Sequence, residues 1–334
     1  MRITFVGPLI STFVKNDLTI LSRANQVKAF DVQIGKGYQA IGKMIALHFH
    51  ILVSLLTSDC LFFWFADYYT LIPSLVARAL GKKVFVVAGG FDITYIPELG
   101  IGARTRPLRW FAVKNTFKIA SHIFPVSMDT QHDLDEAVPN HPPSTMIYNA
   151  VDTSVYKYKE APRQQMALTV SQADSIREYR RKGIDTFIES SVLLPEVEFH
   201  VVGVRGEVVE EARNAASEFK NVTIRPGRLP LEEILNEFWD AAAYCQFSIE
   251  ERFGVSVAEA MSCGCIPVVT PVKAVLEVVG DSGVIVDKNS KDSIAGGITR
   301  ALAASNEERR QCAEHASQFD IEHRAIKLLG VVHR

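Results

Sequence analysis

The chain has 334 residues, a formal net charge of −2, and 48% hydrophobic against 22% charged residues. This is the composition of a folded protein long enough for two domains, and it excludes disorder as the main state. Binding to long nucleic acid normally requires a basic excess, so no nucleic-acid partner is expected.

The five cysteines are few, odd in number and scattered, which favours a reducing, cytoplasmic environment over a disulfide scaffold. Only Cys263 and Cys265 lie close together, and no partner pair stands at zinc spacing, so no metal site is expected. The N-terminus enters a strand at once, without the pattern of a signal peptide.

Short apolar runs alternate with segments of helical period along the whole chain, which predicts parallel sheets covered by helices on both faces. In the first half, the predicted strands are 3–6, 29–34, 60–65, 83–87, 122–126 and 145–148, with helices over 69–80 and 108–120. The most apolar stretch, 41–56, is too short to span a bilayer and predicts a buried helix. In the second half, the predicted strands are 166–170, 198–202, 222–224, 242–247, 266–269 and 283–286.

A polar run at 157–165 has the composition of a linker and divides the chain into two domains, 1–155 and 156–334. The last helix is a candidate to pack back onto the first domain. Residues 1–155 carry 14 Lys/Arg and 11 Asp/Glu, net +3, and the remainder is net −5. The predicted fold class is α/β, with two doubly wound Rossmann-like domains facing a central cleft in which ligands bind.

The stretch 247–270 is the most informative for chemistry. A strand ends near Phe247, a polar loop carries Glu251, and Gly254 opens a helix that Gly264 ends. The N–H groups at such a helix start suit a diphosphate, and Glu259, one turn further, suits a ribose diol. Alternatively, the acidic residues only stabilise the helix dipole.

The same stretch resembles the E-x7-E signature of family-4-type (group 1) glycosyltransferases, which have the GT-B fold. Seven residues separate Glu251 from Glu259, and Phe-Gly is among them. Four more segments resemble family segments and occur in the family's order: Asn-Ala-Val-Asp at 149–152, Lys-Gly-Ile-Asp at 182–185, Gly-Arg-Leu-Pro at 227–230, and Leu-Glu-Val-Val followed by Gly-Asp-Ser-Gly at 276–283.

The resemblance implies a metal-independent, retaining transfer of a sugar from a nucleotide-sugar donor, which is a substrate, so no cofactor is expected. The donor would bind the C-terminal domain and the hydroxyl acceptor, a sugar or a lipid-linked glycan, mainly the N-terminal one. Lys182 would neutralise the leaving diphosphate, and Glu251 would bind sugar hydroxyls. Glu259 would bind the ribose, and the backbone of Phe253 and Gly254 would approach the phosphates or the sugar.

The chain departs from the family pattern after the strand 166–170, where the usual Gly-Arg pair is missing and the loop is longer. Ser171 at this strand end is a candidate donor contact. Arg177 stands five residues before Lys182, the family's usual Arg-to-Lys separation, and is the candidate stand-in, with Arg180 and Arg181 as rivals. Alternatively, these bases form a solvated cap on the helix that follows.

Two features of the first domain have open interpretations. Asp92 follows a tight glycine turn, where it would bind a sugar or acceptor hydroxyl or merely hold the turn. The stretch 104–118 has five basic and no acidic residues among aromatics. It predicts either peripheral contact with the inner membrane face or an ordinary helix with Trp110 and Phe117 inward.

The sequence thus predicts a retaining glycosyltransferase. The missing Gly-Arg pair and the thin resemblance in the first domain leave open a catalytically silent sugar-nucleotide-binding partner subunit. Another GT-B sugar-nucleotide enzyme, such as an epimerase, is the second alternative.

Overall fold

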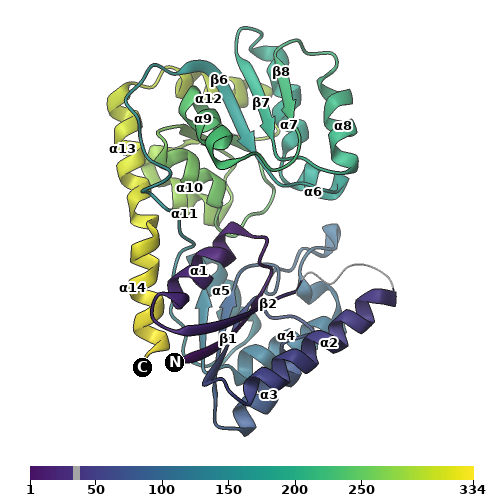
Figure 1. Ribbon diagram of the computed structural model, residues 1–334. Helices are drawn as coiled ribbons and strands as arrows, with labels where there is room; N and C mark the ends of the chain where they lie inside the picture. Colours follow the sequence, from purple (N-terminus) through teal and green to yellow (C-terminus); the bar gives the residue numbers. More distant parts are fainter. Residues whose placement is uncertain (33–37) are drawn as a thin grey trace. The chain divides into compact units, whose positions relative to one another are not determined.

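The computed structural model describes residues 1–32 and 38–334 (Figure 1). The chain forms two compact units, one of Met1–Ala150 with Ile321–Arg334 and one of Val151–Asp320. The division falls just before the predicted boundary, and the last helix belongs to the first unit.

The first unit is a five-stranded, fully parallel sheet in the order β2-β1-β3-β4-β5. Its strands are β1 (Arg2–Gly7), β2 (Gln26–Asp31), β3 (Cys60–Trp64), β4 (Lys83–Ala88) and β5 (His122–Pro125). Its helices are α1 (Thr12–Ser22), α2 (Tyr38–Leu55), α3 (Leu71–Ala79), α4 (Pro107–Ile119), α5 (Met128–Ala137) and α14 (Ile321–Val332), with short 3₁₀ turns η1 (Pro97–Leu99) and η2 (Ala103–Thr105).

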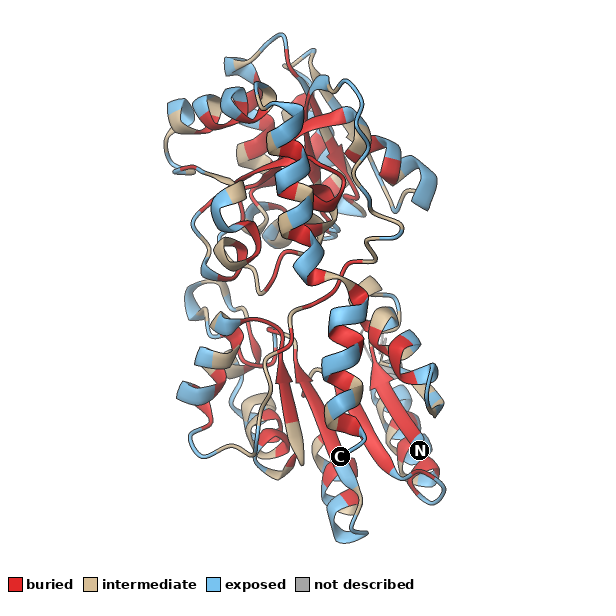
Figure 2. Cartoon of the chain, turned by 90° about the vertical axis from the view of Figure 1, so that its left-hand side faces the viewer, coloured by how far each residue is buried: buried red, intermediate tan, exposed pale blue. Residues whose placement is uncertain are grey.

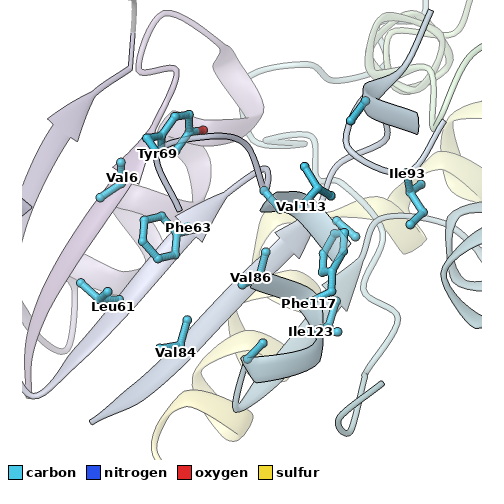
Figure 3. Packing of buried hydrophobic residues seen from close by; sticks show 14 of the residues in the cluster. Val6, Leu61, Phe63, Tyr69, Val84, Val86, Ile93, Val113, Phe117 and Ile123 are labelled. Carbon is cyan, nitrogen blue, oxygen red and sulfur yellow. The ribbon is translucent and has the colours of Figure 1, made fainter. Parts of the chain in front are cut away.

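Alternate strand residues of this sheet form two hydrophobic cores. On one face, Phe63 and Val86 pack with Ile51 of α2 and Phe117 of α4 (Figure 3). On the other face, α1 and α14 cover a cluster that contains Trp64. The central strands β3 and β4 are buried almost throughout, whereas the helices have a buried and an exposed side (Figure 2).

A buried ion pair holds α14 in the first unit. The Arg324 guanidinium donates to both carboxylate oxygens of Asp17, at 2.5 and 2.6 Å, and to the carbonyls of Ile147 and Tyr148, both at 2.8 Å. The indole N–H of Trp64 donates to the same carboxylate at 2.7 Å. Paired and fully hydrogen-bonded in this way, the two charges are tolerated in the core.

The structure corrects two expectations for this unit. Residues 145–148 run beside β5 and donate to the carbonyls of Ile123 and Pro125, but they form no strand. Pro125 has no N–H, so the return bond of a parallel ladder cannot form there. The helix over 41–56 is buried on one side only, and positions 33–34 of the predicted strand 29–34 lie outside the described residues.

The second unit is a six-stranded parallel sheet in the order β11-β10-β9-β6-β7-β8. Its strands are β6 (Gln164–Val170), β7 (Glu198–Val202), β8 (Val222–Arg225), β9 (Ala241–Gln246), β10 (Ile266–Val269) and β11 (Val284–Ile285), which confirms the predicted set. Its helices are α6 (Ile176–Arg181), α7 (Ile184–Ser190), α8 (Glu207–Ala216), α9 (Leu231–Asp240), α10 (Val255–Ser262), α11 (Lys273–Val279), α12 (Lys291–Leu302) and α13 (Asn306–Ala316), with 3₁₀ turns η3 (Ser191–Leu193), η4 (Gly280–Ser282) and η5 (Ser317–Phe319). Across residues 1–32 and 38–334, no helix is long and apolar enough to cross a bilayer.

Candidate active site

The second sheet has its topological switch point between β6 and β9. From β6 the order continues to β7 and β8, whereas from β9 it continues in the other direction to β10 and β11. Because both strands are parallel, the loops that follow them leave the same edge of the sheet. Ligands of open α/β sheets bind in the crevice at such a point.

A glycine allows the first of these loops to approach the second. Gly183, between α6 and α7, has a φ of +67°, and a Cβ atom there would lie 2.2 Å from the carbonyl oxygen of Phe247. Only glycine combines this left-handed backbone with such a close approach. The N–H of Ile249 also donates to the Arg181 carbonyl at 2.8 Å, so the α6–α7 turn is fixed against the end of β9.

This arrangement brings Lys182 and Glu251 together. The Lys182 ammonium donates to Glu251 Oε2 at 2.7 Å, and the two side chains are only 22% and 18% exposed. Burial alone would raise the pKa of Glu251, but Lys182 and Arg181 outweigh it and hold the pKa below its usual range. Glu251 is therefore charged at neutral pH, and it contacts the Lys182 side chain at the switch point.

Arg181, a rival candidate on sequence grounds, reaches the same loop. It donates to the Glu250 carbonyl at 2.8 Å and lies 3.4 Å from a carboxylate oxygen of that residue, which also pairs with Arg252 at 2.7 Å. Arg177, the first choice, is exposed in the first turn of α6. Five residues of helix rotate a side chain by about 140°, so Arg177 and Lys182 leave α6 in different directions.

The second loop ends where α10 begins. Gly254 caps α10 with a φ of +90°, which a side chain would strain. The Phe253 ring is buried and packs edge-on against Phe319, with ring centroids 5.3 Å apart. The Phe253 side chain thus anchors the loop, and the first N–H groups of α10 follow directly.

Glu259 lies on α10 with a partner that the sequence did not suggest. The Tyr156 hydroxyl hydrogen-bonds to its carboxylate. Burial raises the pKa of Glu259 to about 7, against the opposing effects of that hydrogen bond and of Arg228. Tyr156 stands just after Asn-Ala-Val-Asp, at the beginning of the second unit, and no local pattern in the sequence marks it as a site residue.

Two buried serines mark the ends of the switch-point strands. Ser171 follows β6 and Ser248 lies just beyond β9, 8% and 1% exposed. Neither hydroxyl has a hydrogen-bond partner within the described part of the chain. Buried hydroxyls normally have one, so both are available to a ligand or a water molecule. The sequence pattern indicates Ser171 at the end of its strand but not Ser248, which has the pattern of an ordinary loop serine.

Asp92 belongs to the first unit and is fully buried. Its carboxylate accepts from the N–H groups of Ala66 at 3.1 Å and Gly90 at 3.0 Å. Burial raises its pKa to about 6 despite these bonds. Asp92 therefore connects the loop that contains Ala66 to the loop that contains Gly90. Its contact with an acceptor hydroxyl stays a prediction.

The stretch 104–118 forms η2 and α4. Arg104 stacks on Tyr95, 5.0 Å from the ring centroid, and Arg109 pairs with Asp67 at 2.9 Å. Phe117 is fully buried, as the ordinary-helix interpretation predicts. In residues 1–32 and 38–334, no three His, Cys, Asp or Glu side chains are grouped as metal ligands would be.

Residues 168–319 match the family described as "Glycosyl transferases group 1". The chain is 37% identical over 76 residues to O-antigen chain mannosyltransferase B of Escherichia coli, spanning 23% of this chain and 20% of that protein. It is 30% identical over 165 residues to one component of the phosphatidylinositol N-acetylglucosaminyltransferase of Arabidopsis thaliana, spanning 47% of this chain and 36% of that protein. The chain thus matches well under half the length of either relative.

Solved structures cover the whole fold. The structure of Anabaena Alr3699/HepE in complex with UDP and glucose aligns with a TM-score of 0.77, at 17% identity, over 100% of this chain and 99% of that one. Together with the two parallel-sheet units, this alignment defines the GT-B fold. The match to the group 1 glycosyltransferase family covers residues 168–319, all of which lie in the second unit.

Proposed function

We propose that this protein transfers a sugar from a nucleotide-sugar donor to a hydroxyl acceptor with retention of the anomeric configuration and without a metal ion. The observation that carries the proposal is the contact between Lys182 and Glu251 at the switch point of the second sheet. The second unit would hold the donor, and the first unit would contribute the acceptor contacts. The proposed location is cytoplasmic.

The diphosphate of the donor would take the place of Glu251 as the partner of Lys182. The first N–H groups of α10, next to Gly254, would bind the same phosphates. As the bond from sugar to phosphate breaks, negative charge grows on the leaving diphosphate, and a cation already in position stabilises it. Glu251, released from Lys182, would accept hydrogen bonds from sugar hydroxyls.

The remaining groups would bind the nucleoside. Glu259 would accept hydrogen bonds from the ribose diol, with Tyr156 orienting its carboxylate. Ser171, with its unpartnered buried hydroxyl, would contact the donor from the end of β6. Arg181 contacts the loop that carries Glu251 through the Glu250 carbonyl. It is therefore a better candidate than Arg177 for a second phosphate contact.

The test is an assay of the purified chain against a panel of UDP, GDP and ADP sugars. Release of nucleoside diphosphate is followed with and without candidate sugar and lipid-linked acceptors, in the presence of EDTA. Acceptor-dependent release with an unchanged anomeric configuration, read by NMR, supports the proposal. Nucleotide binding without any release, over the whole panel, would instead identify a protein that binds sugar nucleotides without catalysis.

A further inference from the structure

Helix α2 exposes a stripe of large apolar side chains. The side with Leu47, Ile51 and Leu55 is buried against the sheet. The outer side and the residue after the helix carry residues three or four positions apart, which places them along one line of the helix surface. They are Ile41, Ile45, Phe49, Val53 and Leu56, exposed by 61%, 65%, 63%, 45% and 77%. An exposed apolar surface of this kind marks an interaction site.

The neighbouring helices α3 and α4 also expose large apolar side chains. α3 packs beside α2, and α4 packs beside α3, on the same face of the first sheet (Figure 1). On α3 and α4, the exposed large apolar residues include Ile72, Leu75, Leu108 and Phe111. We call these residues, together with the α2 stripe, the α2–α4 surface.

The α2–α4 surface is one-sided in charge. None of the three helices contains Asp or Glu, and their five bases are Lys43, Arg78, Arg109, Lys114 and Lys118. The acidic residues of this unit lie elsewhere: α5 alone has Asp129, Asp133, Asp135 and Glu136 and no Lys or Arg. Apolar side chains flanked by bases, with no acid among them, complement a surface that is apolar inside and anionic outside.

We propose that the α2–α4 surface docks on an anionic lipid bilayer, with α2 lying in the interface. An amphipathic helix binds there by inserting its apolar side while its bases meet the anionic head groups. A second copy of the same surface is a poorer partner, because it would bring like charges together. The inference is independent of the proposed catalytic function, and it extends the predicted membrane contact from 104–118 to α2 and α3. Because Arg104 and Arg109 already have partners, Lys43, Arg78, Lys114 and Lys118 are the bases that would meet the head groups.

The test is co-sedimentation of the full chain with phosphatidylcholine vesicles, with and without about a third phosphatidylglycerol. Binding is expected only with the anionic lipid, and it should weaken as NaCl is raised, since salt screens the attraction. Phe49→Asp should lower the partition coefficient at least about tenfold. Ile326→Asp is the matched control and should leave binding unchanged, because Ile326 lies on α14 of the same unit and is 72% exposed, against 63% for Phe49.

The bases are tested in the same way. Each Lys or Arg near an anionic surface changes partitioning roughly fivefold, so Lys43→Glu with Lys118→Glu should lower it about 25-fold or more. Lys327→Glu, exposed on α14, is the control. Circular dichroism verifies folding, and Ile45→Asp replaces Phe49→Asp if that variant does not fold.

Three outcomes would overturn the proposal. The first is no sedimentation with anionic vesicles at low salt, and the second is equal binding to neutral vesicles. The third is a dimer, detected by light scattering, that Phe49→Asp dissociates, since the apolar stripe would then belong to a contact between two copies.

Discussion

Lys182 is the residue whose chemistry the proposed reaction needs most. Its ammonium already contacts Glu251 in a position where a diphosphate would replace the carboxylate. Because the leaving group gains charge in the transition state, Lys182→Ala should lower kcat by about 100-fold or more and change donor KM less. Initial rates at varied donor concentration measure both.

Lys220→Ala is the matched control, since Lys220 is an exposed lysine of the same unit. A Lys182→Ala enzyme with near-normal kcat would shift the role to Arg181, and Arg181→Ala would then be the decisive variant.

Glu259 should give the proposed nucleotide site a pH dependence. Its pKa of about 7 means that half of the carboxyl groups are protonated at neutral pH. The protonated form is the weaker acceptor for a ribose diol, so nucleoside diphosphate affinity should fall as the pH drops through 7, approaching tenfold per unit below it. Calorimetric titration between pH 6 and 8.5 measures this inflection.

Tyr156 sets the position of that inflection. Its hydrogen bond lowers the pKa of Glu259, so Tyr156→Phe should move the inflection to higher pH. Glu259→Gln, which cannot ionise, separates this effect from titration of the ligand's own phosphate. An inflection that stays in place in Tyr156→Phe would remove the orienting role from Tyr156.

At the scale of elements, Gly183 lets the α6–α7 turn pack against the end of β9, which places Lys182 beside Glu251. Gly183→Ala adds a methyl group 2.2 Å from a carbonyl oxygen as well as a strained φ, so the turn must move away from β9. We expect a loss of stability clearly beyond the roughly 1 kcal/mol of the backbone strain alone, together with lower kcat. Urea unfolding and the donor assay measure the two effects.

Gly81→Ala is the control for the backbone strain. Gly81 has a φ of +70°, and no atom lies within 4 Å of the place where a methyl group would be added, so this variant carries the strain without the collision. Equal losses in the two variants would mean that the approach to Phe247 is unimportant.

The sequence predicted where helices and strands lie better than it predicted their burial and their pairing with neighbouring elements. Strands such as β3 and β10 matched because buried parallel strands are continuous apolar runs. The helix over 41–56 was predicted with the right type and the wrong environment, since an apolar helix in a core and one with an exposed apolar stripe have the same composition. The prediction of a strand at 145–148 was wrong because the residue that prevents the hydrogen-bond ladder, Pro125, lies on the neighbouring strand β5 and not in the segment itself.

In the site, too, local patterns could be predicted from the sequence, whereas contacts between distant segments could not. Glu251, Gly254 and Glu259 could be selected because their spacing within one loop and helix is a local pattern. Tyr156 and Ser248 could not, because their significance depends on contacts across the folded unit. Arg177 was preferred to Arg181 on spacing alone, which ignores the direction in which α6 presents each side chain.

At the scale of the molecule, the ion pair between Arg324 and Asp17 fixes α14 to the first unit. Both side chains are at most 3% exposed. Arg324→Ala leaves the Asp17 carboxylate buried without its counter-charge, so we expect a loss of about 3–5 kcal/mol in the free energy of unfolding. Chemical denaturation measures it.

Lys327→Ala, on the exposed side of α14, should change stability by less than about 0.5 kcal/mol. A loss in Arg324→Ala that the double variant Asp17→Asn with Arg324→Met does not reduce would argue that packing, and not the unpaired charge, is responsible.

The return of α14 to the first unit also sets an order of events during synthesis. Residues 1–150 are synthesised before the second unit, whereas α14, which completes the core on one face of their sheet, is synthesised after it. The intervening unit is continuous in sequence and can close on its own while the nascent first unit still lacks Leu328 and Val332 over its sheet. The first unit, although its synthesis begins before that of the second unit, can therefore complete its folding only after the second unit has been synthesised.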